Sequence, residues 1–441
     1  MKIAVVGSGV GGLSTAWLLA RQHEVVVYEA EDWPGGHAHT VDVEVEGRAV
    51  AVDTGFIVFN HRTYPLFCRM LAELGVAEKP SSMSFSAHIE SSGVEYNAAD
   101  LSRLFVQRRN LLRPSFWSML RGIHRFYREA RELLGEGSAE IPLGRYLEEN
   151  GYSDSFVEDH LVPMASAIWS TDRARMMEFP ASFLVRFFEH HGFLELRERP
   201  TWYTVEGGSR AYVARIADFL GERIRLNEPV RAVRRTSAGV EVVSASDTEV
   251  FDQCVLATHG DISRRLLVNP TDAEAALLAP IEYRDNSVVL HTDAAVMPRR
   301  RAAWASWNAH VGRDRGAPPT LTYWMNLLQG IPVETPVLLT LNRDDEIAPE
   351  RVLGRWNYAH PVFTPEAVAA AERLDEVQGR DRIWFAGAGW GYGFHEDGAR
   401  SGVRIARALG VPFGEDLPAR PIDRGAGHAA GEPIAAHRSA A

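Results

Sequence analysis

Three glycines near the amino terminus have the spacing of a phosphate-binding turn. Gly7, Gly9 and Gly12 lie between an apolar run at residues 3–6 and a helical pattern at residues 13–20. The first glycine allows a tight turn, the second lets the backbone approach a pyrophosphate, and the third lets the helix pack closely. The free N–H groups and dipole of a helix amino terminus favour anions. The spacing therefore predicts a dinucleotide-binding turn.

An acidic residue, Glu29, stands at the end of the next apolar run, residues 24–28. At that place in a strand–helix–strand unit, a carboxylate accepts hydrogen bonds from ribose hydroxyls. The same negative charge disfavours a 2′-phosphorylated ligand. The strand–helix–strand unit predicts that a dinucleotide is contacted by Gly7, Gly9, Val10, Gly11, Gly12 and Glu29. A chain that also bound a nicotinamide cofactor would be expected to carry a second fingerprint, so oxygen or a separate carrier is favoured as electron acceptor.

A second glycine pair, Gly35-Gly36, follows Glu29 and is succeeded by His37 and by Thr54-Gly55. With this pair the pattern resembles the flavoprotein amine oxidase and phytoene desaturase superfamily. The resemblance implies FAD, with its isoalloxazine over the two glycine turns, although members usually carry arginine at the position of His37. His37-x-His39 is an alternative metal motif, but without further ligands nearby it predicts no metal site.

A glycine- and aromatic-rich segment, residues 383–399, resembles the last FAD-binding strand of the superfamily, followed by a loop and a helix pointing at the flavin. A helix amino terminus there stabilises the anion formed on flavin reduction. The resemblance implies further FAD contacts from Gly36, His37, Thr54, Gly55, Val230, Gly387, Gly393, Phe394 and His395. Glu396 and Asp397 suit either a helix start or catalysis.

The predicted catalytic groups are His395, Tyr392, Trp390, Tyr323 and Asn326. His395 is the candidate base, because the ordinary pKa of histidine lies near neutrality. Packing is the alternative role for the aromatic side chains, and hydrogen bonding to the backbone is the alternative for Asn326.

Composition excludes several classes of protein. The chain has 441 residues, of which 46% are hydrophobic and 24% charged, as in globular proteins. A net charge of −11 disfavours nucleic-acid binding. Two cysteines argue against a disulfide scaffold and suit a reducing compartment. No segment approaches the roughly 20 apolar residues of a membrane-spanning helix. We therefore predict a cytoplasmic protein.

Residues 101–131 form a basic exception in this acidic chain, with eight arginines and one acid, Glu129. Leucine and aromatic side chains are interleaved with the arginines. A basic, aromatic and amphipathic segment suits an anionic membrane surface, which predicts peripheral association with the inner membrane face. The alternative is a pair of ordinary helices with a solvated arginine face.

Short blocks across residues 1–412 resemble a narrower bacterial family. Its members are FAD-dependent, amine-oxidase-like oxidoreductases found beside cyclopropane or methyl-branched fatty-acid methyltransferases. The blocks are residues 53–60, 63–65, 83–85, 167–170, 179–181, 323–326, 360–363 and 391–398. The resemblance implies desaturation of a methyl-branched fatty-acyl lipid and suggests a methyltransferase partner. Many amine oxidases of the superfamily use a lysine near the flavin. Lys2 belongs to the first strand, so Lys79 is the one candidate here.

The predicted fold is α/β: a doubly wound, discontinuous Rossmann-like FAD-binding domain with an inserted α+β substrate domain. The FAD-binding domain comprises residues 1–60, 200–265 and 350–415, the substrate domain 61–199 and 266–349, and residues 416–441 form a flexible tail. We predict an FAD-dependent oxidoreductase that removes a hydride from a carbon of a hydrophobic small molecule or phospholipid acyl chain. An amine oxidase acting on a small amine or polyamine is one alternative, and a flavin-binding redox or assembly partner without turnover is another.

Overall fold

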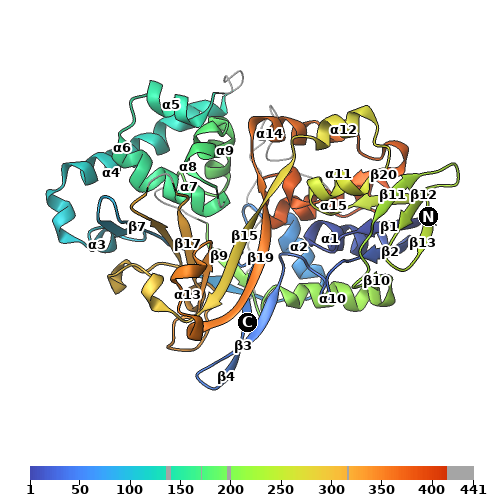
Figure 1. Cartoon of the computed structure of the whole chain (residues 1–441), viewed down its shortest axis with the longest axis horizontal. Helices are drawn as coiled ribbons and strands as arrows, with labels where there is room; N and C mark the ends of the chain where they lie inside the picture. Colours follow the sequence, from blue (N-terminus) through green and yellow to red (C-terminus); the bar gives the residue numbers. More distant parts are fainter. Residues whose placement is uncertain (136–140, 170, 196–199, 315–316, 415–441) are drawn as a thin grey trace, which may run out of the picture.

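A computed structural model describes residues 1–135, 141–169, 171–195, 200–314 and 317–414, so the predicted tail at 416–441 lies outside the described residues. The nucleotide-binding half is built on a five-stranded parallel sheet (Figure 1). Its strands, in spatial order, are β10 (Ile224–Arg225), β2 (Glu24–Tyr28), β1 (Lys2–Val6), β14 (Gln253–Leu256) and β20 (Ile383–Phe385). The inner strands are buried on both faces, which explains their continuous apolar sequences.

The strand order places a ligand site at one end of this sheet. From β1 the chain continues to β2 and β10 on one side, whereas β14 and β20 lie on the other. Ligands of such open α/β sheets bind at the carboxyl ends of the strands where the order reverses. Here that place lies beyond the ends of β1 and β14.

Two helices pack closely together against this sheet, α1 (Val10–Leu19) and α15 (His395–Ala408). A Cβ atom at Gly398 would lie 2.5 Å from Val10 Cγ1, and one at Gly402 would lie 2.4 Å from Ser14 Oγ. Glycine at these positions lets the helices approach closely. The amino terminus of α15 is thereby held beside the amino terminus of α1.

The second half of the molecule is built on a seven-stranded sheet. Its order is β19 (Val352–Val362), β15 (Glu282–His291), β18 (Leu338–Leu341), β17 (Thr320–Trp324), β16 (Trp307–Val311), β7 (Phe85–Ile89) and β8 (Val94–Asn97). All neighbours are antiparallel except β16 and β7. The predicted boundary at residue 350 groups β19 with the FAD-binding domain, whereas the structure pairs it with β15. Local sequence patterns do not specify which sheet a strand joins.

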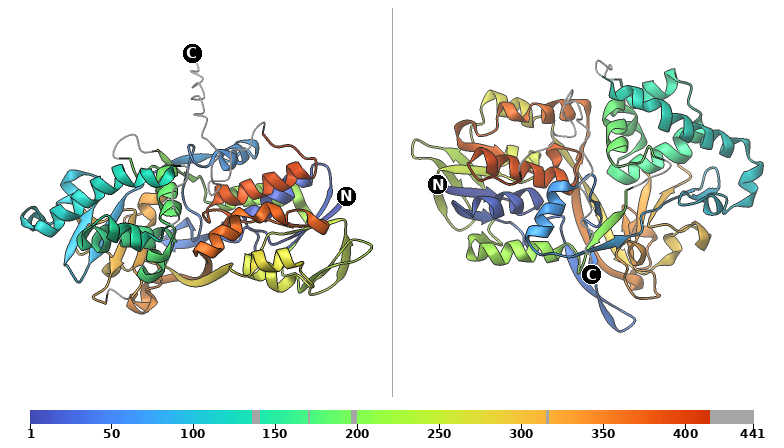
Figure 2. Two further views of the ribbon diagram at one scale, coloured as in Figure 1. Left: turned by 90° about the horizontal axis from the view of Figure 1, so that it is seen from above. Right: turned by 180° about the vertical axis from the view of Figure 1, so that it is seen from behind.

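Helices from the middle of the chain cover one side of the seven-stranded sheet (Figure 2). They are α3 (Leu101–Leu104), α4 (Pro114–Glu129), α5 (Leu143–Glu149), α6 (Asp154–Phe156), α7 (Val162–Trp169), α8 (Arg173–Glu178) and α9 (Ala181–His190). Helix α4 buries Phe116, Met119 and Phe126 and exposes Arg121 and Arg128. Within the described part of the chain, no helix has the length and apolar character needed to cross a membrane.

Smaller elements complete the two halves. They are the hairpin β3 (Thr40–Val45)–β4 (Arg48–Asp53), the sheet of β5 (Phe59–Asn60), β9 (Trp202–Val205) and β6 (Glu78–Ser81), the sheet of β11 (Ala232–Arg235), β12 (Val240–Val243) and β13 (Thr248–Phe251), and the helices α2 (Pro65–Glu73), α10 (Arg210–Leu220), α11 (Gly260–Leu266), α12 (Asp272–Leu278), α13 (Met325–Leu328) and α14 (Pro365–Glu372). The carboxylate of Asp53, at the end of β4, accepts hydrogen bonds from Ser209 N (2.8 Å) and Gln329 Nε2 (2.7 Å). It therefore ties β4 to the start of α10 and to the loop after α13.

Candidate active site

The turn between β1 and α1 leaves no room for larger residues at three of its glycines. Gly7 has a φ of +99°, and its N–H donates to Tyr28 O at 2.8 Å. A Cβ atom at Gly12 would lie 2.0 Å from Gly7 O, and one at Gly11 would lie 2.8 Å from Gly387 N. Gly7 and Gly12 thus close the turn, and Gly11 lets the carboxy-terminal glycine loop approach α1.

The fourth glycine of the turn, Gly9, has a different environment. A Cβ atom there would meet no atom within 4 Å. Gly9 precedes Val10 as the N-cap of α1, and no side chain caps the helix. The space beside Gly9 thus adjoins the uncapped start of α1, and a helix start of this kind is where a pyrophosphate binds. The residues present fit the phosphates of FAD.

Glu29 lies where its carboxylate can meet the nucleotide. Its Oε2 accepts hydrogen bonds from the backbone N–H (2.9 Å) and from the hydroxyl of Ser8, within the glycine turn. Its Oε1 accepts from Glu31 N at 3.0 Å. Glu29 therefore positions the turn, and its ribose contact stays a prediction. Val230 lies half-buried between β10 and β11, and its adenine contact likewise stays a prediction.

The two further glycine turns of the sequence prediction meet at this site. Gly35 forms an isolated β-bridge with Gly9, and a Cβ atom at Gly36 would lie 3.2 Å from Gly9 Cα. The Thr54-Gly55 turn packs on His37: a Cβ atom at Gly55 would lie 2.3 Å from His37 O. Segments 7–12, 35–39 and 53–56 are therefore contiguous.

Histidine and tyrosine rings surround His37, and we name this group the histidine cluster. The ring centre of His37 lies 4.9 Å from that of Tyr358, 5.6 Å from His360 and 6.0 Å from His259. His259 in turn stacks on Tyr283 at 4.1 Å. The cluster thus joins the glycine turns of the nucleotide-binding half to β15 and β19.

Sequence reasoning did not propose His259, Tyr283, Tyr358 or His360 as site residues. The block at residues 360–363 was the available sequence signal for these residues. It contributes to the family resemblance but assigns no function to His360. The cluster also holds the turn at Thr54, because His39 Nδ1 lies 3.0 Å from Thr54 Oγ1 and 2.8 Å from the hydroxyl of Tyr358.

The histidine cluster is electrically neutral at ordinary pH. Burial lowers the pKa of His37 well below 6.5, and the neighbouring His360, His259 and His395 lower it further. Burial likewise lowers the pKa of His360 to about 4. His37 Nε2 is enclosed without a hydrogen-bond partner among the described residues. It is a polar atom available to a cofactor or substrate.

The carboxy-terminal glycine loop is held by the helix that follows it. Gly387 N donates to Ser401 Oγ at 2.9 Å. The carboxylate of Asp397 accepts from Tyr392 N at 3.0 Å and from Phe394 N at 3.1 Å, so it closes the loop around Gly393. Burial raises the pKa of Asp397 to about 6. These contacts favour the helix-start role for Asp397.

Glu396 supports the start of a different helix, α2. Its carboxylate accepts from Leu66 N at 3.2 Å and Phe67 N at 3.0 Å, and lies 3.2 Å from Arg400 Nη2. Burial raises its pKa to about 7, although Arg400 and the backbone N–H groups oppose the shift. Glu396 therefore joins α2 to α15 beneath the site.

His395 is buried at the first position of α15. Its ring stacks on Phe56 with centres 3.4 Å apart, and its Nε2 lies 3.0 Å from the hydroxyl of Tyr212. Burial lowers its pKa to about 3, so the ring is neutral and weakly basic. These contacts favour a packing role, and the role of base stays a prediction.

The other catalytic candidates divide into two groups. Tyr392 and Trp390 are buried in the loop beside α15, and the Tyr392 ring lies 4.8 Å from that of Phe183. Tyr323 lies in β17 and packs edge-on against Trp307 of β16 at 5.1 Å. Asn326 donates to the carbonyls of Val333 and Thr335 and accepts from Val337 N, which closes the loop after α13. Its contacts are the backbone hydrogen bonds of the alternative interpretation.

One group of side chains in the described part of the chain has the spacing of metal ligands. It consists of His61, Cys68 and Glu78, whose ligand atoms lie within 4.8 Å of one another. Neither histidine of the His37-x-His39 motif belongs to it.

A sequence profile described as flavin containing amine oxidoreductase matches residues 10–341. The chain belongs to this family. A relative, the putative flavin-containing monoamine oxidase AofH of Mycobacterium tuberculosis, is 28% identical over 254 residues, 55% of this chain. That match spans 54% of AofH, about half the length of the relative.

Solved structures share the fold over nearly the whole chain. Cyclohexylamine oxidase from Brevibacterium oxydans IH-35A is 17% identical with a TM-score of 0.67, covering 92% of this chain and 98% of its own. The CLA-producing fatty acid isomerase from P. acnes is 14% identical with a TM-score of 0.64 and the same coverage. The predicted superfamily, α/β fold, oxidoreductase class and FAD cofactor are confirmed.

Proposed function

We propose that the protein removes a hydride from a carbon of an uncharged, hydrophobic substrate, and that this substrate is a fatty-acyl chain of a lipid, which it desaturates. The neutral histidine cluster beside the glycine turns is the observation that carries this proposal. Bound FAD supplies the acceptor for the hydride. The residues of the chain bind and orient the substrate, exclude water and stabilise negative charge.

The electrostatics of the cluster favour an uncharged substrate. The neighbouring charges that shift the pKa of His37 and of His360 are those of other protonated histidines. A protonated amine is a cation, as is a protonated histidine, and it would lose the same hydration on entering this environment. The nearby carboxylate of Asp53 already accepts hydrogen bonds from Ser209 and Gln329. Around His37 and His360 little compensates for a buried ammonium group, whereas at the other edge of the cluster the carboxylates of Asp261 and Asp285 oppose the lowering of the pKa of His259.

The position of α15 suits the negative charge that develops on the cofactor. The first turn of α15 begins at His395, beside Phe56 and the Thr54-Gly55 turn. The amino-terminal end of a helix carries a partial positive charge. Two buried acids of this turn, Glu396 and Asp397, have raised pKa values and bond to backbone N–H groups. Protonation of either acid would leave the positive end of α15 less compensated by negative charge.

The structure removes one of the two lysines from consideration for amine oxidation. Lys2 Nζ pairs with Glu249 Oε2 at 2.7 Å, at the start of β1. Lys79 lies in β6, opposite Thr204 of β9. Lys79 is therefore the one lysine left for the role that the superfamily resemblance assigns to lysine in amine oxidation.

Amine oxidation is the second candidate function. The names of two similar proteins favour it, since AofH is called a putative monoamine oxidase and the Brevibacterium protein is a cyclohexylamine oxidase. The name of the P. acnes protein, a fatty acid isomerase, favours an acyl substrate. A flavin-binding redox or assembly partner without turnover, including a partner of a methyltransferase, is the third candidate.

Anaerobic bleaching of the flavin absorption band tests the proposal. The FAD-loaded protein is mixed with a methyl-branched phospholipid in neutral detergent micelles and, separately, with a panel of monoamines and polyamines. We expect bleaching by the lipid and recovery of an unsaturated acyl chain. Bleaching by an amine and not by lipid would replace the proposal with amine oxidation. Absence of bleaching by every compound would favour the binding partner without turnover.

A further inference from the structure

Four large apolar side chains are exposed close together at one end of the half that is built on the seven-stranded sheet. The exposed fractions are 76% for Leu101, 48% for Leu111, 89% for Leu112 and 46% for Trp117. Single exposed apolar residues are ordinary on protein surfaces, whereas a contiguous group marks an interaction site. These residues belong to α3, to the 3₁₀ turn η1 (Arg108–Leu112) and to the first turn of α4.

Backbone and ring contacts hold these residues next to one another. Phe105 N donates to Leu101 O at 3.3 Å, and the Phe105 ring lies 5.5 Å from the ring of Trp117. Trp117 Nε1 donates to Leu111 O at 2.9 Å, and Leu112 follows Leu111 in η1. We name the group of Leu101, Phe105, Leu111, Leu112 and Trp117 the apolar tip.

Arginines surround the apolar tip, and some come from a distant part of the sequence. Arg103, Arg108, Arg109 and Arg121 are exposed beside it, with Arg121 one helical turn after Trp117. The exposed run Arg299-Arg300-Arg301 joins them, because the 3₁₀ turn η6 (Arg301–Ala303) contacts α3. We name these seven arginines the basic rim.

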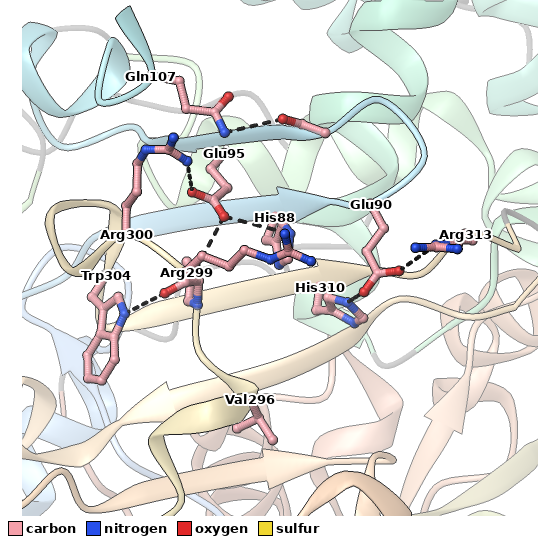
Figure 3. A network of polar contacts seen from close by, with 12 residues as sticks. His88, Glu90, Glu95, Gln107, Val296, Arg299, Arg300, Trp304, His310 and Arg313 are labelled. Carbon is pink, nitrogen blue, oxygen red and sulfur yellow. Dashed lines mark hydrogen bonds and ion pairs between the residues drawn. The ribbon is translucent and has the colours of Figure 1, made fainter.

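A buried carboxylate holds the distant arginines in place. Glu95, in β8, is 2% exposed. Its carboxylate accepts from Arg299 N at 3.2 Å and pairs with Arg300 Nη1 at 3.0 Å, as Figure 3 shows. The guanidinium of Arg301 lies over the ring of Trp304 at 3.7 Å. The run of arginines is thus anchored against β8 before any partner binds.

The turn η1 is anchored to the β7–β8 turn in the same way. The side chains of Gln107 and Arg109 donate to Gly93 O at 3.2 Å and 2.6 Å, and Arg113 Nη2 donates to Ser92 O at 2.8 Å. The segments that carry the apolar tip are already folded and anchored. Binding a partner therefore requires little further loss of conformational freedom in these segments.

We propose that the apolar tip and the basic rim together dock on the surface of an anionic phospholipid bilayer. Arginine pairs with lipid phosphate, and exposed leucine and tryptophan enter the boundary between headgroups and acyl chains. Two acids pair with the rim: Glu95 is buried against Arg300, and the exposed Asp100 caps α3 and pairs with Arg103 at 3.3 Å. Helices α3 and α4 form the end of the molecule opposite its amino terminus in Figure 1, so a flat surface can reach them.

This docking goes beyond the proposed function and does not rest on it, because a surface can bind lipid headgroups whatever the site oxidises. The charge of the segment is decisive for the choice of occupant. Eight arginines and one glutamate lie within residues 101–131 of a chain whose net charge is −11. A bilayer rich in phosphatidylglycerol supplies the complementary charge over a wide, flat area.

Vesicle co-sedimentation of the full chain tests the proposal. The vesicles contain either phosphatidylglycerol with phosphatidylcholine or phosphatidylcholine alone. The tip variant carries Arg108→Glu, Arg121→Glu and Leu112→Ser, since these arginines have no ion pair within the described structure. The matched control carries Arg215→Glu and Phe219→Ser on α10 together with Arg380→Glu, all at exposed positions, so that both variants reverse two arginines and remove one apolar side chain.

We expect binding to the anionic vesicles that is at least about tenfold weaker in the tip variant and weaker in high salt for both proteins. The control variant should bind as the unmodified protein does, and circular dichroism should show that both variants fold. Equal binding to both kinds of vesicle, equal binding by the tip variant, an equal loss in the control or no binding by the unmodified protein would each overturn the proposal.

Discussion

The two ends of the molecule treat charge in opposite ways. At the nucleotide end, ionisable side chains are buried and their pKa values shift toward the neutral form, as for His37, His395 and Glu396. At the apolar tip, arginines remain exposed beside exposed leucines. We propose a division of work in which the nucleotide end is the neutral site for hydride removal and the tip supplies charge for a lipid surface.

The largest expected effect concerns the nucleotide end and comes from Gly9→Ala. A Cβ atom at Gly9 has free space in the structure, so we expect the variant to fold normally. The added methyl group would occupy the place of the pyrophosphate, which should weaken FAD binding by about 100-fold. Fluorescence titration of the apoprotein with FAD measures the change.

Gly312→Ala is the matched control, because a Cβ atom there also meets nothing within 4 Å. Unchanged FAD affinity in Gly9→Ala would show that the cradle lies elsewhere.

A smaller effect is expected for Asn326, and it distinguishes a structural role of this residue from a catalytic one. Asn326→Ala removes three hydrogen bonds to Val333, Thr335 and Val337. We expect a loss of about 2 kcal/mol in the free energy of unfolding, with flavin reduction per folded molecule unchanged. Urea denaturation measures the first and anaerobic bleaching the second. Asn357→Ala, on the exposed face of β19, should lose far less stability. Full stability with lost turnover would restore Asn326 as a catalytic residue.

A pH dependence of stability, partly cancelled by buried acids, follows from the buried histidines. Burial lowers the pKa of His191 and His395 to about 3 and of His360 to about 4. The unfolded chain therefore takes up protons first, so the stability that these rings contribute is full above pH 6.5 and is lost as the pH falls toward 4. Each ring contributes about 1 kcal/mol per pH unit in that window.

Buried carboxylates act in the opposite direction. The raised pKa values of Asp53, Glu396 and Asp397 give stability that is lost as the pH rises through 6 to 7. The histidines with lowered pKa values outnumber these acids. We therefore expect the thermal unfolding midpoint to decrease as the pH is lowered from 6.5 to 5. His395→Gln should flatten the slope, and His124→Gln on the exposed face of α4 is the control. A midpoint that rises on acidification would contradict the neutral state of the buried histidines.

The sequence predicted the nucleotide end well because its requirements are local. Gly7, Gly9 and Gly12 act through backbone geometry within one turn, and their spacing is visible in the sequence. The histidine cluster could not be predicted in the same way, since its rings come from loops and from β15 and β19, and only the fold brings them together. The Arg299-Arg300-Arg301 run was missed for the same reason: the buried carboxylate of Glu95 places it beside α3.

Burial and neighbouring residues also determine the roles of His395 and Asn326, which residue type alone does not reveal. His395 was predicted as a base from the ordinary pKa of histidine, whereas its stacking on Phe56 and its burial depend on neighbours distant in sequence. Asn326 was predicted as a site residue from its place in a family block, and its partners became visible only with the loop that it closes.

The central claim is that the two ends act on one substrate, with the tip docking on the bilayer from which the acyl chain enters the site. The most direct test compares flavin reduction by the same methyl-branched phospholipid in anionic vesicles and in neutral detergent micelles, for the unmodified protein and the tip variant. We expect the tip variant to be slower by about tenfold on vesicles and unchanged in micelles. Equal rates on vesicles, or an equal loss in micelles, would contradict the claim.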